Sequence, residues 1–123
     1  VTAAQAAKML LVTLGYSTDY EGFTGAAWST NVTILATQAK LFDGLNLSPT
    51  QVLTRDEAAQ MIWNALNAYE VTYTTQTVTD ANGQESIKVV REEKVIAGTT
   101  DKLTLIKDKY GIDTPPTEKK TQP

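Results

Sequence analysis

Two segments about fifty residues apart begin with nearly the same helix-start signal. Residues 1–10 read Val-Thr-Ala-Ala-Gln-Ala-Ala-Lys-Met-Leu, and residues 53–62 read Leu-Thr-Arg-Asp-Glu-Ala-Ala-Gln-Met-Ile. In each, a Thr stands three residues before a Gln or Glu, which is the spacing of a helix capping box: Thr2 with Gln5, and Thr54 with Glu57. The chain is therefore predicted to contain a helical repeat. Each unit would expose an apolar face that a neighbouring unit has to cover.

Apolar spacing predicts three helices in the first part of the chain, at residues 2–15, 30–41 and 54–69. Gly15 follows the first helix as a C-terminal cap. In the third helix the three- and four-residue spacing places on one stripe Ala58, Met61, Ile62, Ala65, Leu66 and Tyr69. These positions are predicted to face the core.

The pattern changes after residue 70 from helical spacing to strand-like alternation. Strands are predicted from residue 71 to about 77 and at 86–96, joined by a turn at Asp80-Ala81-Asn82-Gly83. A short helix is predicted at 103–110, and the Pro-rich residues 113–123 have the composition of a linker. We predict an α+β, mainly helical fold: helical repeats at 1–70, a hairpin and short helix at 71–112, packed on or extending the bundle, and a tail at 113–123.

Composition excludes several classes of function. The chain has no cysteine, no histidine and a net charge of -3, so thiolate nucleophiles, His-based catalytic pairs and Cys or His zinc sites are absent. No basic cluster predicts nucleic-acid binding, and no stretch reaches the ~20 apolar residues of a membrane span. Carboxylate pairs such as Asp19 with Glu21 are ordinary on a loop, and residues 80–85 are too short for a calcium loop. We expect no enzyme activity, no cofactor and no metal site.

Residues 23–68 resemble the S-layer homology (SLH) repeat. The resemblance begins with an aromatic opening residue, Phe23, and a Trp before a helix, Trp28. A turn glycine, Gly44, follows, and then an apolar residue and a proline, Leu47 and Pro49. Residues 53–59 are similar to the Thr-Arg-Ala-Glu signature of that family. Residues 1–16 resemble the closing helix of a preceding repeat. The resemblance thus covers one full, diverged repeat and the end of another.

What the SLH resemblance implies is an extracellular module at a bacterial cell surface. It would anchor a secreted protein non-covalently to an acidic, pyruvylated polysaccharide of the cell wall. The residues that match the family's ligand-binding positions are Arg55, Trp28 and Gly44. An Arg pairs well with a carboxylate, and an aromatic face stacks on a sugar ring. The first unit departs from this pattern, because Ala3 stands in the place of the signature Arg.

The same residues also allow an alternative without sugar binding. Trp28 can serve as a core residue, and Thr54, Glu57, Thr2 and Gln5 can serve only as helix caps. The β-branched segment 72–79 can form a strand edge that pairs with another copy of the chain. In this alternative the chain is a structural or self-assembly domain of a surface layer or appendage, and a homo-oligomer is possible.

Overall fold

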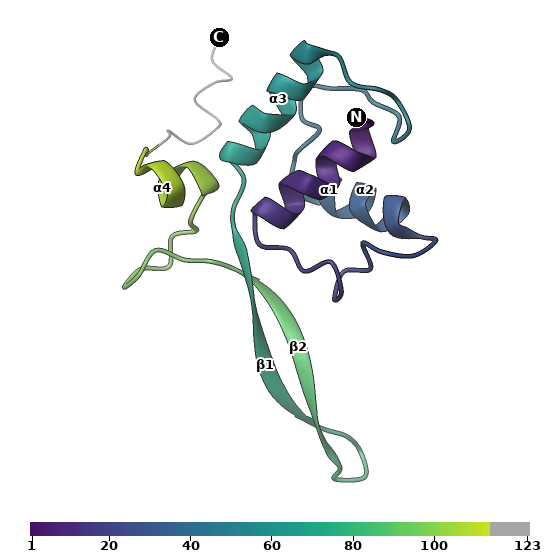
Figure 1. The fold of residues 1–123 in the computed structure, drawn as a ribbon. Coiled ribbons are helices and arrows are strands. Elements are labelled where there is room, and N and C mark those ends of the chain that lie inside the picture. Colours follow the sequence, from purple (N-terminus) through teal and green to yellow (C-terminus); the bar gives the residue numbers. More distant parts are fainter. Residues whose placement is uncertain (114–123) are drawn as a thin grey trace.

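The computed structural model describes residues 1–113 (Figure 1). The elements in chain order are α1 (Ala3–Thr13), α2 (Trp28–Gln38), α3 (Arg55–Leu66), β1 (Val71–Thr79), β2 (Glu85–Glu93) and α4 (Leu105–Tyr110). Helices together with a two-stranded antiparallel sheet confirm the predicted α+β class. The predicted tail, 113–123, lies outside the described residues apart from Asp113.

Both predicted capping boxes are confirmed. The backbone N–H of Gln5 donates to Thr2 Oγ1 (3.2 Å) and the N–H of Thr2 donates to Gln5 Oε1 (3.0 Å). The corresponding distances between Glu57 and Thr54 are 3.2 and 2.9 Å. The backbone of the two caps is also alike, with φ and ψ of -80° and 165° at Thr2 and of -78° and 168° at Thr54. Each cap contributes about 1 kcal/mol to helix stability.

The segment before α3 pairs with the start of α1. Ala3 N–H donates to Gln51 O (2.9 Å), and Leu53 N–H donates to Val1 O (3.0 Å). The first of these bonds satisfies an N–H group that a helix start leaves without a partner within the helix. They hold the beginnings of the two matching helices side by side.

The core lies where α1 sits between α2 and α3 (Figure 1). Phe23, from the loop before α2, is fully buried in this core. Leu105 of α4 is also buried in it. The cluster consists of Ala7, Leu11, Leu14, Phe23, Val32, Leu35, Ala36, Leu41, Met61, Ala65, Ala68 and Leu105. This aliphatic core fixes the three long helices relative to one another.

The two matching helices bury different faces. Leu11 is fully buried in α1, whereas Trp63, its counterpart in α3, is 48% exposed; Met61 is fully buried in α3, whereas Met9 in α1 is 57% exposed. The predicted core-facing stripe is therefore correct at Met61 and Ala65 and wrong at Ile62 and Tyr69, which are 53% and 45% exposed. The reason is that, among the helices and strands of residues 1–113, α3 packs only on α1 and α4.

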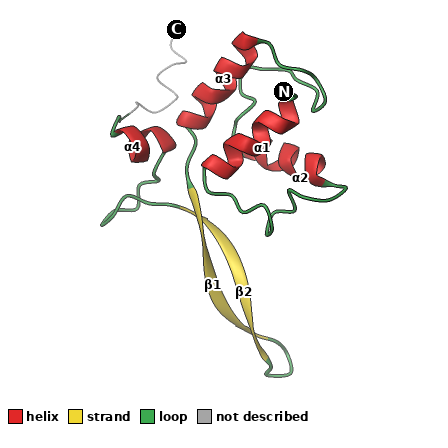
Figure 2. Ribbon diagram, in the orientation of Figure 1, coloured by secondary structure: helices red, strands yellow, loops and turns green. Residues whose placement is uncertain are grey.

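The hairpin extends away from the helices as a long ribbon (Figure 2). Its register runs from Val71 opposite Glu93 to Thr79 opposite Glu85. The predicted turn is confirmed, because Asp80 Oδ1 accepts the N–H groups of Asn82 (2.8 Å) and Gln84 (2.9 Å). The second strand ends at Glu93, before the predicted residue 96, because the following backbone groups pair with the segment before α4: Glu70 N–H donates to Leu103 O (2.9 Å) and Leu103 N–H donates to Lys94 O (2.9 Å).

A polar cluster fixes the base of the hairpin to the loop after α1. Tyr73 Oη donates to Glu21 Oε2 (2.7 Å) and accepts the N–H of Ser17 (2.9 Å). Arg91, the cross-strand partner of Tyr73, donates to the same Glu21 oxygen (2.7 Å) and lies over the ring of Tyr16 (5.3 Å). Burial, together with the Glu21 carboxylate, raises the pKa of Tyr73 to about 12. Glu21 thus attaches the hairpin to the loop after α1 through its bonds to Tyr73 and Arg91.

Glu70 and Asp108 form a carboxyl pair between the hairpin base and α4. The Glu70 side chain is 4% exposed, and its Oε1 has no hydrogen-bond partner, since Lys94 Nζ lies 3.9 Å away. Burial raises the pKa of Glu70, and a hydrogen bond with Asp108 raises it further. The same hydrogen bond lowers the pKa of Asp108. The environment therefore favours the protonated form of Glu70 and the ionised form of Asp108.

This pair makes stability depend on pH. Because the folded-state pKa of Glu70 is raised, its contribution is present at low pH and is lost as the pH rises through that pKa. The Asp108 contribution is lost only at still lower pH, through its lowered pKa. We expect Glu70→Gln, which keeps the hydrogen bond and cannot ionise, to reduce the loss of unfolding free energy between acidic and neutral pH. Urea unfolding of both proteins across this range checks it; equal pH slopes would contradict the raised pKa of Glu70.

Candidate functional site

The three residues that match the SLH ligand positions do not come together in the structure. Trp28 lines a cavity of about 550 Å³ on the side of α1. Gly44 lines a different, larger cavity of about 1050 Å³. Arg55, the first residue of α3, is exposed and lines neither cavity. Trp28 and Arg55 belong to helices that do not pack on each other, because α1 lies between α2 and α3.

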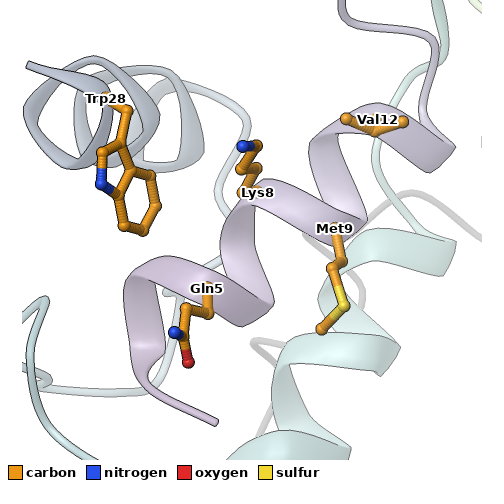
Figure 3. A pocket seen from close by; sticks show the side chains of 5 residues that line it. All are labelled: Gln5, Lys8, Met9, Val12 and Trp28. Carbon is orange, nitrogen blue, oxygen red and sulfur yellow. The ribbon is translucent and has the colours of Figure 1, made fainter. Parts of the chain in front are cut away.

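The Trp28 cavity is built by two helices. Trp28 is the first residue of α2, is half-buried and packs against the core, so that the position of its ring is fixed. Lys8 reaches from α1 to the indole, with its Nζ 5.5 Å from the ring centroid. Figure 3 shows Lys8 opposite the indole, with Met9 and Val12 farther along α1. A cation and an aromatic face therefore meet over a partly apolar wall.

The surroundings of the Lys8–Trp28 pair favour a negatively charged ligand. No acidic side chain lines the cavity. Helix α2 starts at Trp28 with Ala27 as its N-cap, which supplies no side-chain hydrogen bond, and no acidic residue lies in its first turn. The positive end of the helix dipole thus adds to the charge of Lys8. The site can hold a ligand with a carboxylate beside an apolar ring face.

Lys8 was not among the residues predicted for the site. It is the single charged residue of α1, the helix in which Ala3 aligns with Arg55 of α3. The sequence shows both features: the lone cation of this helix and the Ala at the position that aligns with Arg55. The contact with Trp28 depends on how α1 packs on α2, and the sequence pattern does not show that packing.

Neither a metal centre nor a membrane helix occurs in the described part of the chain. Among residues 1–113, no three acidic side chains are grouped closely enough to hold a metal ion. No helix in this range is long and apolar enough to cross a bilayer. Comparison of the chain with protein-family models, curated proteins and solved structures found no match. Function is therefore inferred from the residues and their geometry.

Proposed function

We propose that this chain is a non-catalytic module of a bacterial cell-surface protein that anchors it non-covalently to an acidic cell-wall polysaccharide. The observation that carries the proposal is the Lys8–Trp28 pair in a cavity without acidic side chains. Lys8 pairs with a carboxylate of the polymer, such as a pyruvyl group, and the indole covers the apolar face of the sugar ring. The SLH resemblance of residues 23–68 supports the same class of ligand.

Arg55 has a secondary place in this proposal. It is exposed and forms no ion pair within residues 1–113. An extended polymer carries acidic groups at intervals, so a second group can reach Arg55 while the first lies at Lys8. The affinity gained at an exposed guanidinium is modest, because water and salt screen the charge.

A fluorescence titration tests the proposal. The chain has two tryptophans, so a Trp63→Phe background assigns the signal to Trp28. The titrants are a pyruvylated N-acetylhexosamine glycoside and the same glycoside without the pyruvyl group. We expect saturable changes in Trp28 emission with the pyruvylated sugar and at least tenfold weaker binding of the neutral one. Equal binding of the two sugars, or no change with either, would contradict recognition of the acidic group.

The hairpin favours a second candidate function, assembly with another copy. Strand β1 has the sequence VTYTTQTVT without any charge, whereas β2, ESIKVVREE, carries five charged residues. Charged side chains are a usual protection of strand edges, and β1 lacks them. The free edge of β1 is therefore suited to pair with β1 of a second copy. Antiparallel pairing about a twofold axis would bring the two Thr75 residues, at the middle of the strands, opposite each other.

We expect Thr75→Lys to weaken such a dimer about tenfold or more, because like charges opposite each other in a sheet repel. Ser86→Lys on β2 is the matched control, since it adds the same charge to the already charged strand. Sedimentation velocity over a range of concentrations measures the effect. Wild-type protein that stays monomeric at the highest concentration would exclude this assembly.

A further inference from the structure

The larger cavity lies where the end of α2, the second half of α3 and the base of the hairpin meet. Its volume of about 1050 Å³ accommodates a sugar residue with its neighbours. It includes Gly44 but neither Trp28 nor Lys8, so it is separate from the Lys8–Trp28 site. The hairpin contributes Arg91 and Glu93 to its wall, so the site exists only where the hairpin is docked on the helices.

Two exposed aromatic side chains line this cavity. Trp63 is 48% exposed and Tyr69 is 45% exposed, and neither belongs to the buried core. Trp63 aligns with Leu11 of α1, which is fully buried. About half of the Trp63 side chain is open to solvent, so packing of α3 does not use the whole ring. Aromatic rings with one apolar face open to water are suited to cover the C–H face of a pyranose ring.

Amide side chains beside the aromatic rings are held in fixed orientations. Asn64 Nδ2 donates to the carbonyls of Leu41 (2.8 Å) and Asp43 (2.9 Å), and its Oδ1 accepts from Gln60 Nε2 (2.9 Å). Asn67 Nδ2 donates to Trp63 O (2.9 Å). The oxygens Gln60 Oε1 and Asn67 Oδ1 accept no hydrogen bond within residues 1–113. Two oriented acceptors next to aromatic rings are what hydroxyl groups of a sugar require.

The charges around the cavity are balanced. Arg91 is already paired with Glu21 (2.7 Å), and Glu93 with Lys102 (3.5 Å). The remaining charged side chains in the wall are Lys40 and Asp43, one of each sign. Unlike the Lys8–Trp28 cavity, this one has no excess of positive charge, so it favours a neutral ligand.

We propose that the Trp63–Tyr69 cavity, the larger of the two cavities, binds a neutral pyranose unit that stacks on the aromatic rings and donates hydroxyl hydrogen bonds to Gln60 and Asn67. The inference rests on the proposed function in one respect: the neutral unit belongs to the same wall polymer whose acidic group binds at Lys8. The cavity would then bind a second sugar of the repeating unit of the wall polymer. Two subsites on separate faces would raise affinity for a long polymer above that for a single sugar.

The test is an NMR titration of the ¹⁵N-labelled chain with a neutral probe, the β-1,4-linked N-acetylglucosamine trisaccharide. We expect saturable shifts of the Trp63 indole N–H and of the Asn67 and Gln60 amides, while the Trp28 indole N–H stays in place. Trp63→Ala should weaken binding at least tenfold, and an unchanged Trp28 resonance shows that the variant is folded. Tyr110→Ala, an exposed aromatic outside the cavity, is the matched control and should bind as the wild type does.

Each outcome separates this inference from the proposed function. If the neutral trisaccharide at 10 mM leaves Trp63 and the amides unshifted, the neutral-sugar site is wrong, whatever happens at Trp28. If Trp63 responds to the neutral probe while Trp28 ignores the pyruvylated sugar, the neutral-sugar site stands and acidic anchoring fails. Equal affinity of Trp63→Ala and wild type would also overturn the inference.

Discussion

Replacement of Gly15 by alanine is expected to lower the free energy of unfolding by about 3 kcal/mol. Gly15 follows α1 with a φ of 108°, a conformation that L side chains rarely adopt. A Cβ built there would lie 2.3 Å from the carbonyl oxygen of Val71, the first residue of β1. The contact is with backbone, so no side chain can move away to relieve it. Relief would require separation of α1 from the hairpin and loss of the bond from Val71 N–H to Leu14 O (2.9 Å).

Gly25→Ala is the matched control for this prediction. Its φ of 86° is also positive, but nothing lies within 4 Å of a Cβ built there. The substitution introduces the backbone strain alone, expected to cost about 1 kcal/mol. Urea unfolding of both variants measures the difference. A similar loss in the two variants would show that the close approach of Gly15 to Val71 does not hold the hairpin in place.

Replacement of Lys8 by glutamine is expected to weaken binding of the pyruvylated sugar by about 10- to 100-fold, because a hydrogen bond to a charged group contributes about 1.5–3 kcal/mol. Lys8 is the cation closest to Trp28 in a cavity without acidic neighbours, so no other side chain of the cavity wall can replace its charge. Glutamine keeps a polar side chain of similar length. The fluorescence titration in the Trp63→Phe background measures the change.

Lys88→Gln removes the same charge from the exposed part of β2 and serves as the control for net charge. It should bind as tightly as the unsubstituted protein. If Lys8→Gln and Lys88→Gln lose affinity equally, the effect comes from the overall charge of the chain and not from the cavity. Circular dichroism of Lys8→Gln should be unchanged, since Lys8 is no part of the core.

The features of the fold that follow from neighbouring residues could be predicted from the sequence. The capping boxes at Thr2 and Thr54 and the turn at Asp80 each use groups within four residues of one another, so their geometry is a local matter. The short helix α4 is likewise defined by its own caps, Thr104 and Gly111. The α+β class follows from these elements taken together.

Features that depend on packing between distant segments could not be predicted. Glu21 and Arg91 are paired across the loop and the hairpin, and neither residue shows this in its own surroundings in the sequence. The spacing of α3 places Ile62 on its apolar stripe, yet burial at that position requires a partner helix. Spacing shows which side of a helix is apolar, and the arrangement of the other helices decides which part of that side is covered.

The candidate site shows the same limit. Sequence matching selected Trp28 as a ligand residue, and the structure places it at the first position of α2, beside a cavity. It joined Trp28 with Arg55, but the structure places Lys8 next to the indole and leaves Arg55 on another helix. The choice between the two cations depends on α1 lying between α2 and α3.

Co-sedimentation with purified Gram-positive cell walls tests most directly whether the chain is an anchor that binds through the Lys8–Trp28 cavity. The walls are used before and after chemical removal of their secondary polymer, with wild type, Lys8→Gln and Arg55→Ala in parallel. We predict that wild type sediments only with untreated walls, that Lys8→Gln stays largely in solution and that Arg55→Ala loses only part of its binding. Sedimentation of wild type with polymer-free walls, or full binding by Lys8→Gln, would contradict anchoring at this site.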